Sequence, residues 1–296
     1  MQDFRMETFL TVCKYLNYTK AAQELNLTQP AVSQHIRYLE NFYQVQLFYH
    51  AGKKVELTRA GELLRNSALT FKHDEIYLMR MLQDTAKNTR NFAFGATLSV
   101  AEFMLPPDLE RLICAYPQSH IRMEVGNTRE LLSKLDAGEL DFAVVEGEFP
   151  REEYEFLLYR KEPYVPVASR KKAEQYRNAE FRELLSERLI LREPGSGTRE
   201  ILERELRRRG MTTDDFSQIT ELGKIGAIQA MLRANLGISF FYQATLTDRE
   251  TQLAPIELKD FSLEHEVMFI FRKNSSFRED YEEIYAFLTN RENSQN

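Results

Sequence analysis

The chain has 296 residues, of which 43% are hydrophobic, so it is long enough to form more than one domain with ordinary apolar cores. Its formal net charge of −6 excludes a protein that binds nucleic acid over its whole surface. The two cysteines, Cys13 and Cys114, lie far apart and exclude a disulfide framework and a zinc site made from cysteines alone. No apolar run could span a membrane and no basic–apolar signal segment opens the sequence, so we expect a cytoplasmic protein.

The charge is distributed unevenly along the chain. Residues 1–60 contain seven Lys or Arg against five Asp or Glu, a balance of +2, and the remainder contains 32 against 40, a balance of −8. A mildly basic N-terminal unit on an acidic body suits a small DNA-binding head. Because the head is only weakly basic, we expect oligomerisation to supply the phosphate contacts that a single copy lacks.

The first forty residues predict three short helices. Met1–Leu16 is the first, and Thr19–Glu40 divides into two more around a turn at Asn26-Leu27. Thr19 and Thr28 are the expected caps, and Pro30 is tolerated in the first turn of the third helix. The inward positions of that helix are Val32, Ile36 and Leu39, and the outward ones are Gln29, Ser33, Gln34 and Arg37. This pattern predicts a helix-turn-helix that reads a DNA groove.

A two-stranded ribbon is predicted after Glu40, which makes the motif winged. Its turn lies at Ala51-Gly52, and Lys53 and Lys54 lie near its tip. A solvated turn would explain these lysines, but beside a reading helix we favour contact with phosphate or the minor groove. The residues expected to be buried before the turn are Val45, Leu47 and Phe48, and those that alternate after it are Lys54, Val55, Glu56 and Leu57.

Thr58 opens a long helix that extends to about Lys87. Its apolar surface is broad for a helix with no obvious neighbour nearby in sequence, and Glu75 interrupts a regular heptad. We expect it to pair with the same helix of a second chain, and packing on its own body is the alternative. The apolar residues include Leu63, Leu64, Ala68, Leu69, Phe71, Ile76, Leu78, Met79 and Leu82.

Strands and helices alternate from Phe92 onward, which predicts mostly parallel sheets with ligands at the carboxyl ends of the strands. The predicted strands are FAFGA, HIRMEV, DFAVVEG, FLLYR, YVPVAS, LILRE, GISFFY and HEVMFIF. The predicted helices lie within Ala101–Tyr116, in NTRELLSKLDAG, and over Arg199–Arg209, Ile225–Ala234 and Ser276–Thr289.

Four strand ends carry candidate ligand-binding residues. They are Thr97 to Ser99, Asn127-Thr128, the end of Asp141–Glu146, and Pro194 to Thr198. Helix N-termini expose backbone N–H groups with a partial positive charge, so several that converge would form an anion site. Each loop alone is explained equally well by simple capping, and a carboxylate at Glu146 would repel an anion unless it is solvated or paired. Arg199 is expected to pair with Glu203 on the helix surface rather than with a ligand.

No catalytic or cofactor site is indicated. The five histidines are scattered, and neither a metal-ligand spacing nor a nucleophile–base pair is apparent. An enzyme built on the α/β body is therefore a disfavoured alternative. A solute-binding or transport component is the other alternative, and it is disfavoured by the head and by the lack of a signal segment.

Taken together, the chain resembles the LysR-type transcriptional regulators over essentially its whole length. The motifs that carry the resemblance are AAQELNLTQPAVSQHIRYLE, then LF followed by VELTRAG. In the body, NTRELLSKLDAGELDFAVVEG and LREPGSGTRE look like the segments that border the effector cleft of that family. Two positions depart from the family pattern: Tyr43-Gln44 stands where a glycine is usual, and His50 stands where the wing usually has arginine.

The resemblance implies an α+β protein without cofactors that forms dimers or tetramers and binds double-stranded DNA and a small effector, which we expect to be anionic. It implies a winged helix-turn-helix at 1–58, a linker and dimerisation helix at 59–90, and an effector domain of periplasmic-binding-protein type at 91–296. Lobe I would span about 91–161 and 266–290, and lobe II about 162–265.

Pattern and resemblance together assign two sets of site residues. The predicted DNA contacts are Thr28, Gln29, Pro30, Ser33, Gln34, Arg37, Lys53 and Lys54. The predicted effector contacts are Thr97, Ser99, Asn127, Thr128, Glu146, Ser196, Gly197 and Thr198.

Overall fold

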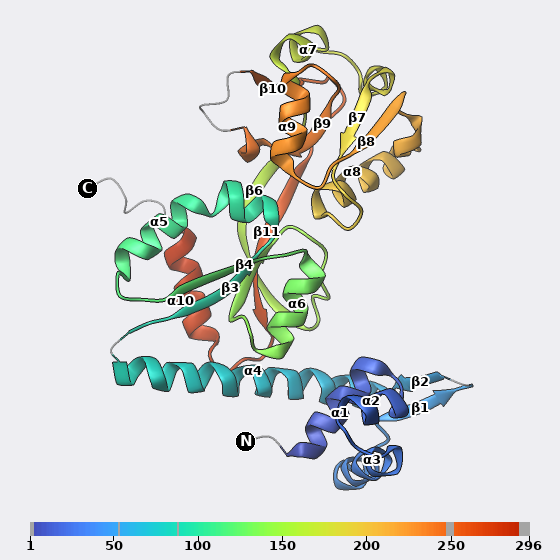
Figure 1. The fold of residues 1–296 in the computed structure, drawn as a ribbon, viewed down its shortest axis with the longest axis vertical. Coiled ribbons are helices and arrows are strands. Elements are labelled where there is room, and N and C mark those ends of the chain that lie inside the picture. The colour runs from blue at the N-terminus through green and yellow to red at the C-terminus, as the bar shows by residue number, and fades with distance from the viewer. Residues whose placement is uncertain (1–2, 53, 88, 247–251, 290–296) are drawn as a thin grey trace.

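The computed structural model describes residues 3–52, 54–87, 89–246 and 252–289. A helical head lies at one end of a long helix, and a body of two lobes stands on that helix (Figure 1). In the part of the chain that is described, no helix has both the length and the apolarity needed to cross a membrane.

The head is a three-helix unit with a two-stranded wing. Its elements are α1 (Phe4–Tyr15), α2 (Tyr18–Glu24), α3 (Gln29–Tyr43), β1 (Phe48–Ala51) and β2 (Lys54–Leu57). The predicted inward positions of α3 are buried in a core that they share with α1, α2 and the wing. Two predictions were wrong. Asn17 rather than Thr19 caps α2, because its side chain accepts a hydrogen bond from the Lys20 N–H, and Val45 is 41% exposed because it lies outside this core.

The long helix α4 (Arg59–Lys87) has two different faces. One face is buried against the body, where Thr70, His73, Asp74 and Tyr77 lie. The Asp74 carboxylate accepts hydrogen bonds from the Ser275 hydroxyl at 2.6 Å and the Ser276 N–H at 2.7 Å. Elsewhere the helix exposes large apolar side chains, namely Leu63, Phe71, Leu78, Met79 and Leu82. Packing on the body thus accounts for only one face of the helix.

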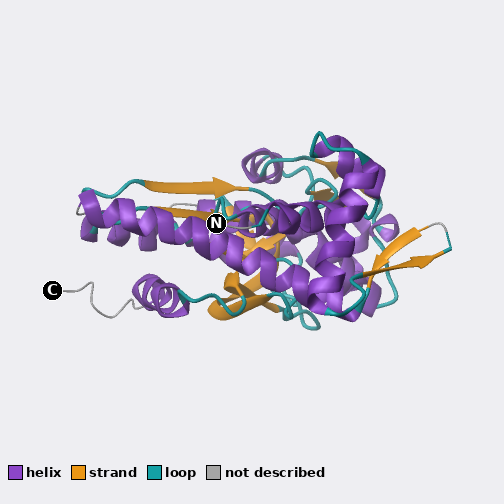
Figure 2. Ribbon diagram, turned by 90° about the horizontal axis from the view of Figure 1, so that it is seen from below, coloured by secondary structure: helices purple, strands orange, loops and turns teal. Residues whose placement is uncertain are grey.

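The lobe next to α4 is built on a mixed sheet. Strand β3 (Phe92–Ala96) is parallel to β4 (Ile121–Val125) and to β5 (Phe142–Val145). Strand β11 (Glu264–Arg272) then lies antiparallel to β5. The helices of this lobe are the π-helix η1 (Val100–Met104), α5 (Pro106–Ala115), α6 (Thr128–Ala137) and α10 (Arg278–Thr289). Figure 2 views the molecule from below and shows α4 running along the underside of the body, with the wing projecting beyond one end.

Two long strands connect the lobes. Strand β6 (Tyr154–Ser169) runs without interruption where two strands were predicted, and β11 pairs with it antiparallel from Arg272↔Tyr154 to Glu264↔Pro163. The charged residues between the two predicted strands gave the appearance of a loop. Inside the strand, Glu162 is instead buried, paired with Arg160 and bonded to the Ala244 N–H at 2.7 Å.

The second lobe is assembled around the far half of β6. That half pairs antiparallel with β9 (Ser239–Tyr242) and β10 (Leu253–Pro255), while β7 (Arg188–Leu191) and β8 (Gln218–Glu221) are parallel. Between the named strands of the described body, four ladders are antiparallel and three are parallel, so the prediction of mostly parallel sheets was wrong. The reason is that both strands that connect the lobes pair antiparallel with their neighbours. The helices are α7 (Arg170–Gln175), α8 (Gly197–Arg208), α9 (Ile225–Arg233) and the short η2 (Phe181–Ser186), η3 (Thr213–Asp215) and η4 (Gln243–Thr245).

Candidate functional site

Six of the eight predicted DNA-binding residues, from Thr28 to Arg37, lie at the start of α3 and along its outer surface. Thr28 caps the helix through its hydroxyl, which accepts from the Ala31 N–H at 3.3 Å. The Gln29 amide donates to the Ser33 hydroxyl at 2.9 Å, so these two side chains are held in register one turn apart. The exposed members are Thr28, Gln29, Pro30, Gln34 and Arg37, while Ser33 is half-buried.

Glu40 fixes the wing relative to α3, a role that the sequence did not indicate. Its carboxylate accepts from the Leu47 N–H at 2.9 Å, at the start of the wing. The helix ends at Gln44, which adopts the left-handed conformation with φ 57° and so occupies the role that glycine has in the family pattern. On the wing, His50 and Lys54 are exposed, whereas Lys53 lies outside the described residues.

A cavity of about 770 Å³ lies between the lobes, and we call it the cleft cavity. Five loops meet there: those after β3, β4, β5, β7 and β8. The predicted effector residues that line it are Thr97, Ser99, Asn127, Thr128, Glu146, Ser196 and Gly197. Thr198 does not line the cavity. Its hydroxyl lies 3.2 Å from the Ser99 Oγ, and its carbonyl accepts from the Tyr164 hydroxyl at 2.7 Å, so it braces the wall from behind.

Two helices begin at the cleft cavity, and their N-termini differ in whether a side chain caps them. Helix α6 has a complete capping box, in which Asn127 accepts from the Glu130 N–H and the Glu130 carboxylate accepts from the Asn127 N–H, both at 3.0 Å. Helix α8 follows Ser196, whose side chain makes no capping hydrogen bond although the residue is only 6% exposed. The first-turn N–H groups of α8 are thus left without the partner that such a position usually provides.

Glu146 is a buried acid at the floor of the cavity. Only 4% of it is exposed, and its carboxylate accepts a hydrogen bond from the Thr97 hydroxyl. Burial raises the pKa of Glu146 to about 7, although its own backbone N–H and the nearby Arg192 partly oppose the shift. A Cβ added to Gly197 would lie 3.6 Å from the Glu146 Oε1, which places this carboxylate beside the first turn of α8.

Basic side chains reach the same cavity, and the sequence analysis missed them. Arg192, Arg129 and Lys224 line it together with several glutamates. Arg192 is 6% exposed and pairs with Glu193 at 2.7 Å. It is the first residue after β7, so the strand-end rule that identified the other loops would also have found it.

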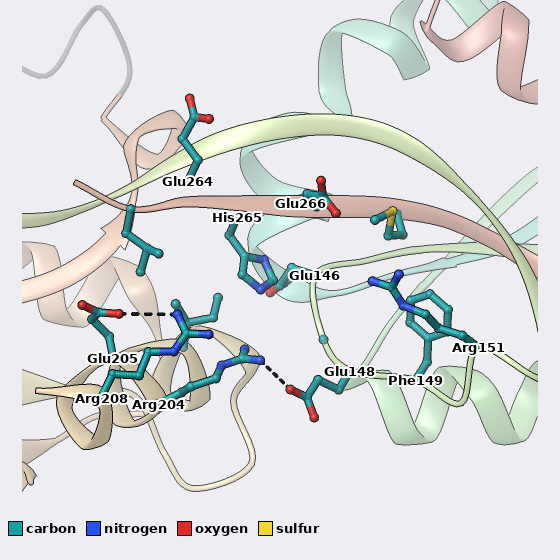
Figure 3. A pocket seen from close by; sticks show the side chains of 14 residues that line it. Glu146, Glu148, Phe149, Arg151, Arg204, Glu205, Arg208, Glu264, His265 and Glu266 are labelled. Carbon is teal, nitrogen blue, oxygen red and sulfur yellow. Dashed lines mark hydrogen bonds and ion pairs between the residues drawn. The ribbon is translucent and has the colours of Figure 1, made fainter. Parts of the chain in front are cut away.

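A second cavity, of about 540 Å³, is also lined by the segment that follows β5, and we call it the rear cavity (Figure 3). Glu146 and Glu148 line both cavities. Arg204 on α8 donates to Glu148 at 2.5 Å, so an ion pair joins the two lobes here. His265 on β11 contacts the Tyr242 hydroxyl at 3.2 Å, and burial and then Arg204 lower its pKa.

The segment after β5 also reaches the long helix. Pro150 lines the cleft cavity and a further cavity of about 590 Å³ beside α4. Glu153 then accepts from Arg65 of α4 at 2.6 Å. Residues 146–153 therefore run continuously from the floor of the cleft to the helix that carries the head.

Neither Arg199 nor Cys13 lines the cleft cavity. Arg199 pairs with Glu203 at 2.6 Å and with Glu221 at 2.7 Å, as its predicted surface pairing requires. Cys13 is half-buried, and burial raises its pKa to about 12. Among the described residues, no group of three or more His, Cys, Asp or Glu is arranged to hold a metal ion.

Two protein-family models together match nearly the whole chain. Residues 4–62 match the model described as the bacterial regulatory helix-turn-helix protein of the lysR family. Residues 86–292 match the LysR substrate binding domain.

Curated relatives align over almost the full length. The chain is 27% identical over 298 residues to the HTH-type transcriptional regulator CysL of Bacillus subtilis, covering 96% of this chain and 94% of CysL. It is 28% identical over 277 residues to the RuBisCO operon transcriptional regulator of Allochromatium vinosum, covering 91% and 89%.

Solved structures share the fold at lower identity. A mutant OxyR of Corynebacterium glutamicum with bound H2O2 superposes with a TM-score of 0.61 at 21% identity, covering 97% of this chain and 91% of that one. The CcmR regulatory domain of Synechocystis, solved in complex with 2-PG, superposes with a TM-score of 0.60 at 21% identity, covering 70% and 99%.

Proposed function

Because the chain belongs to the LysR family of DNA-binding transcriptional regulators, we propose that a small anionic metabolite in the cleft cavity modulates how this protein binds its operator. The observation that carries the proposal is the convergence of seven predicted effector residues, from four loops of both lobes, around one cavity. A ligand that touches both lobes can change their relative position, and α4 connects one of those lobes to the head.

Three features favour an anion in that cavity. The N-terminus of α8 lacks a side-chain cap, and the half-charge of a helix N-terminus attracts anions. Ser196 adds a nearly buried hydroxyl. Arg129, Arg192 and Lys224 supply positive charge in a wall that also carries Glu130, Glu146, Glu148, Glu193 and Glu200. The 2-PG complex of the CcmR regulatory domain supports the idea that this fold holds a small ligand.

The surface of α3 suits sequence-specific contact with DNA. Gln29, Ser33 and Arg37 lie one turn apart on the outer face, where they would reach base edges in the major groove. Thr28, Pro30 and Gln34 border them, and Lys54 would contact phosphate from the wing.

We propose that the chain is divided into a head at 1–58, a linker helix at 59–90 and an effector body at 91–296.

The exposed face of α4 suggests the oligomeric state. Phe71 is 66% exposed and Leu82 is 63% exposed on a helix of 29 residues, which is a large apolar surface to leave in water. Pairing with α4 of a second chain would bury it and place two heads on DNA. We therefore propose a cytoplasmic homodimer that can form homotetramers.

The operator interaction is tested by fluorescence anisotropy on the DNA upstream of the protein's own gene. We expect specific, salt-sensitive binding, and affinity no greater than for random DNA would contradict the proposal. Ser33→Ala should weaken specific binding by roughly 1–3 kcal/mol and leave random DNA nearly unaffected. Lys54→Ala is the matched control, because loss of a phosphate contact weakens both DNAs alike and lowers the salt slope by about 1.

A solute-binding component and an enzyme are the alternatives from other functional classes. The match of residues 4–62 to a regulatory helix-turn-helix model favours a regulator over both. Turnover of a small molecule by the purified chain would favour the enzyme alternative.

A further inference from the structure

Glu146 is held in an unusual place for a residue of an anion site. It is 4% exposed, lines both the cleft cavity and the rear cavity, and lies beside the uncapped first turn of α8. Within the described ranges, Thr97 supplies the only side-chain hydrogen bond to its carboxylate. A carboxylate has roughly four acceptor positions, so this one retains capacity to accept a hydrogen bond from a ligand.

The groups around Glu146 do not neutralise it fully. Arg192 approaches from the end of β7, but its guanidinium already makes two hydrogen bonds to Glu193, at 2.7 and 2.8 Å. On the rear side Arg204 is engaged by Glu148. The other ionisable groups that share a cavity wall with Glu146 are Arg129, Glu130, Glu193, Glu200 and Lys224 in the cleft, and Arg151, Glu205, Arg208, Glu264, His265 and Glu266 in the rear. Tyr242 on β9 also interacts with Glu146 electrostatically.

An anion beside this carboxylate meets two opposing effects. The N-terminus of α8 attracts it, while an ionised Glu146 within a few ångströms repels it, and the repulsion is weakly screened because this carboxylate is buried. A hydroxyl on the ligand removes the conflict, since it can donate to Glu146 while the ionised group faces the helix.

We propose that Glu146 selects the effector, and that the ligand is a small hydroxylated anion whose hydroxyl donates a hydrogen bond to this carboxylate. The inference rests on the proposed function and adds the chemical class of the ligand. An anion without a donor binds only when Glu146 takes up a proton, so its affinity falls as the pH rises.

Matched ligand pairs test the selection on the full-length chain. Isothermal titration calorimetry would compare glycerol 3-phosphate with propyl phosphate, and glycerate with propionate, each up to 50 mM. In each pair the ionised group is kept and the hydroxyls are removed. We expect at least one hydroxylated member to bind ten or more times more tightly than its partner at pH 8, and the gap to narrow at pH 6.

Two variants distinguish a loss of ligand selectivity from a general loss of ligand binding. Glu146→Gln keeps the shape of the side chain and can donate from its amide, so the preference for the hydroxylated member should fall to threefold or less. Glu264→Gln is the matched control, because Glu264 is exposed and lines the rear cavity but not the cleft cavity, so this variant should keep the wild-type preference.

Equal affinities within both pairs, a preference that Glu146→Gln retains, or binding of none of the four probes would overturn the inference. None of these results touches operator binding, which is measured on DNA without a ligand. The failure of this inference is thus distinguishable from failure of the proposed regulator.

Discussion

Helices α6 and α8 begin at the same cavity from opposite lobes, and only α6 has a side-chain cap at its N-terminus. The first turn of α6 is satisfied by its own capping box, so it needs nothing from a ligand. The first turn of α8 has no side-chain cap and lies beside a buried carboxylate from the other lobe. A Ser or Asn before a helix therefore does not by itself identify a binding site. A ligand is favoured where the cap is missing.

The largest expected effect concerns Glu146, because its charge is buried beside α8. Its pKa is about 7 in the folded chain and 4.5 in the unfolded chain, so ionisation opposes folding as the pH rises from 4.5 to 7. Glu146→Gln removes that penalty, which amounts to about 3 kcal/mol above pH 7 and vanishes below pH 4.5. Urea unfolding of the variant and the wild type from pH 4 to pH 8 measures the difference. A stability gap that does not grow with pH would contradict the buried charge.

A pair of cap variants tests the comparison itself. Asn127→Ala breaks the capping box of α6 and should lower the free energy of unfolding by about 1 kcal/mol. Ser196→Ala removes a hydroxyl that caps nothing and should change stability by no more than about 0.3 kcal/mol. Urea unfolding of both variants at pH 7 measures these values, and equal losses would mean that the two N-termini are alike.

A smaller effect is expected where residues 146–153 meet α4. The ion pair of Arg65 with Glu153 is partly exposed, so its coupling energy should be about 0.5 kcal/mol. A double-mutant cycle with Arg65→Gln and Glu153→Gln measures it through unfolding free energies. A coupling energy of zero would mean that this ion pair does not link the cleft to the helix that carries the head.

The sequence predicted the head and the order of elements well, because these depend on local patterns. The inward positions Val32, Ile36 and Leu39 recur at helical spacing, and the strands around the cavity end in polar residues. What it missed depends on contacts between distant segments. The continuity of β6 rests on Glu162 meeting Arg160 and η4, and the position of Thr198 behind the wall rests on Ser99 and Tyr164. No local pattern reveals that Ser196 leaves α8 uncapped.

Control of the heads on DNA by the cleft is tested most directly by footprinting of the operator in living cells, because this measurement needs no identified ligand. The wild-type footprint should change between growth conditions. Ser196→Ala should occupy the same operator with a footprint that stays constant, and Arg37→Ala should leave the operator empty. A Ser196→Ala footprint that changes just as the wild-type footprint does would contradict control through this cavity.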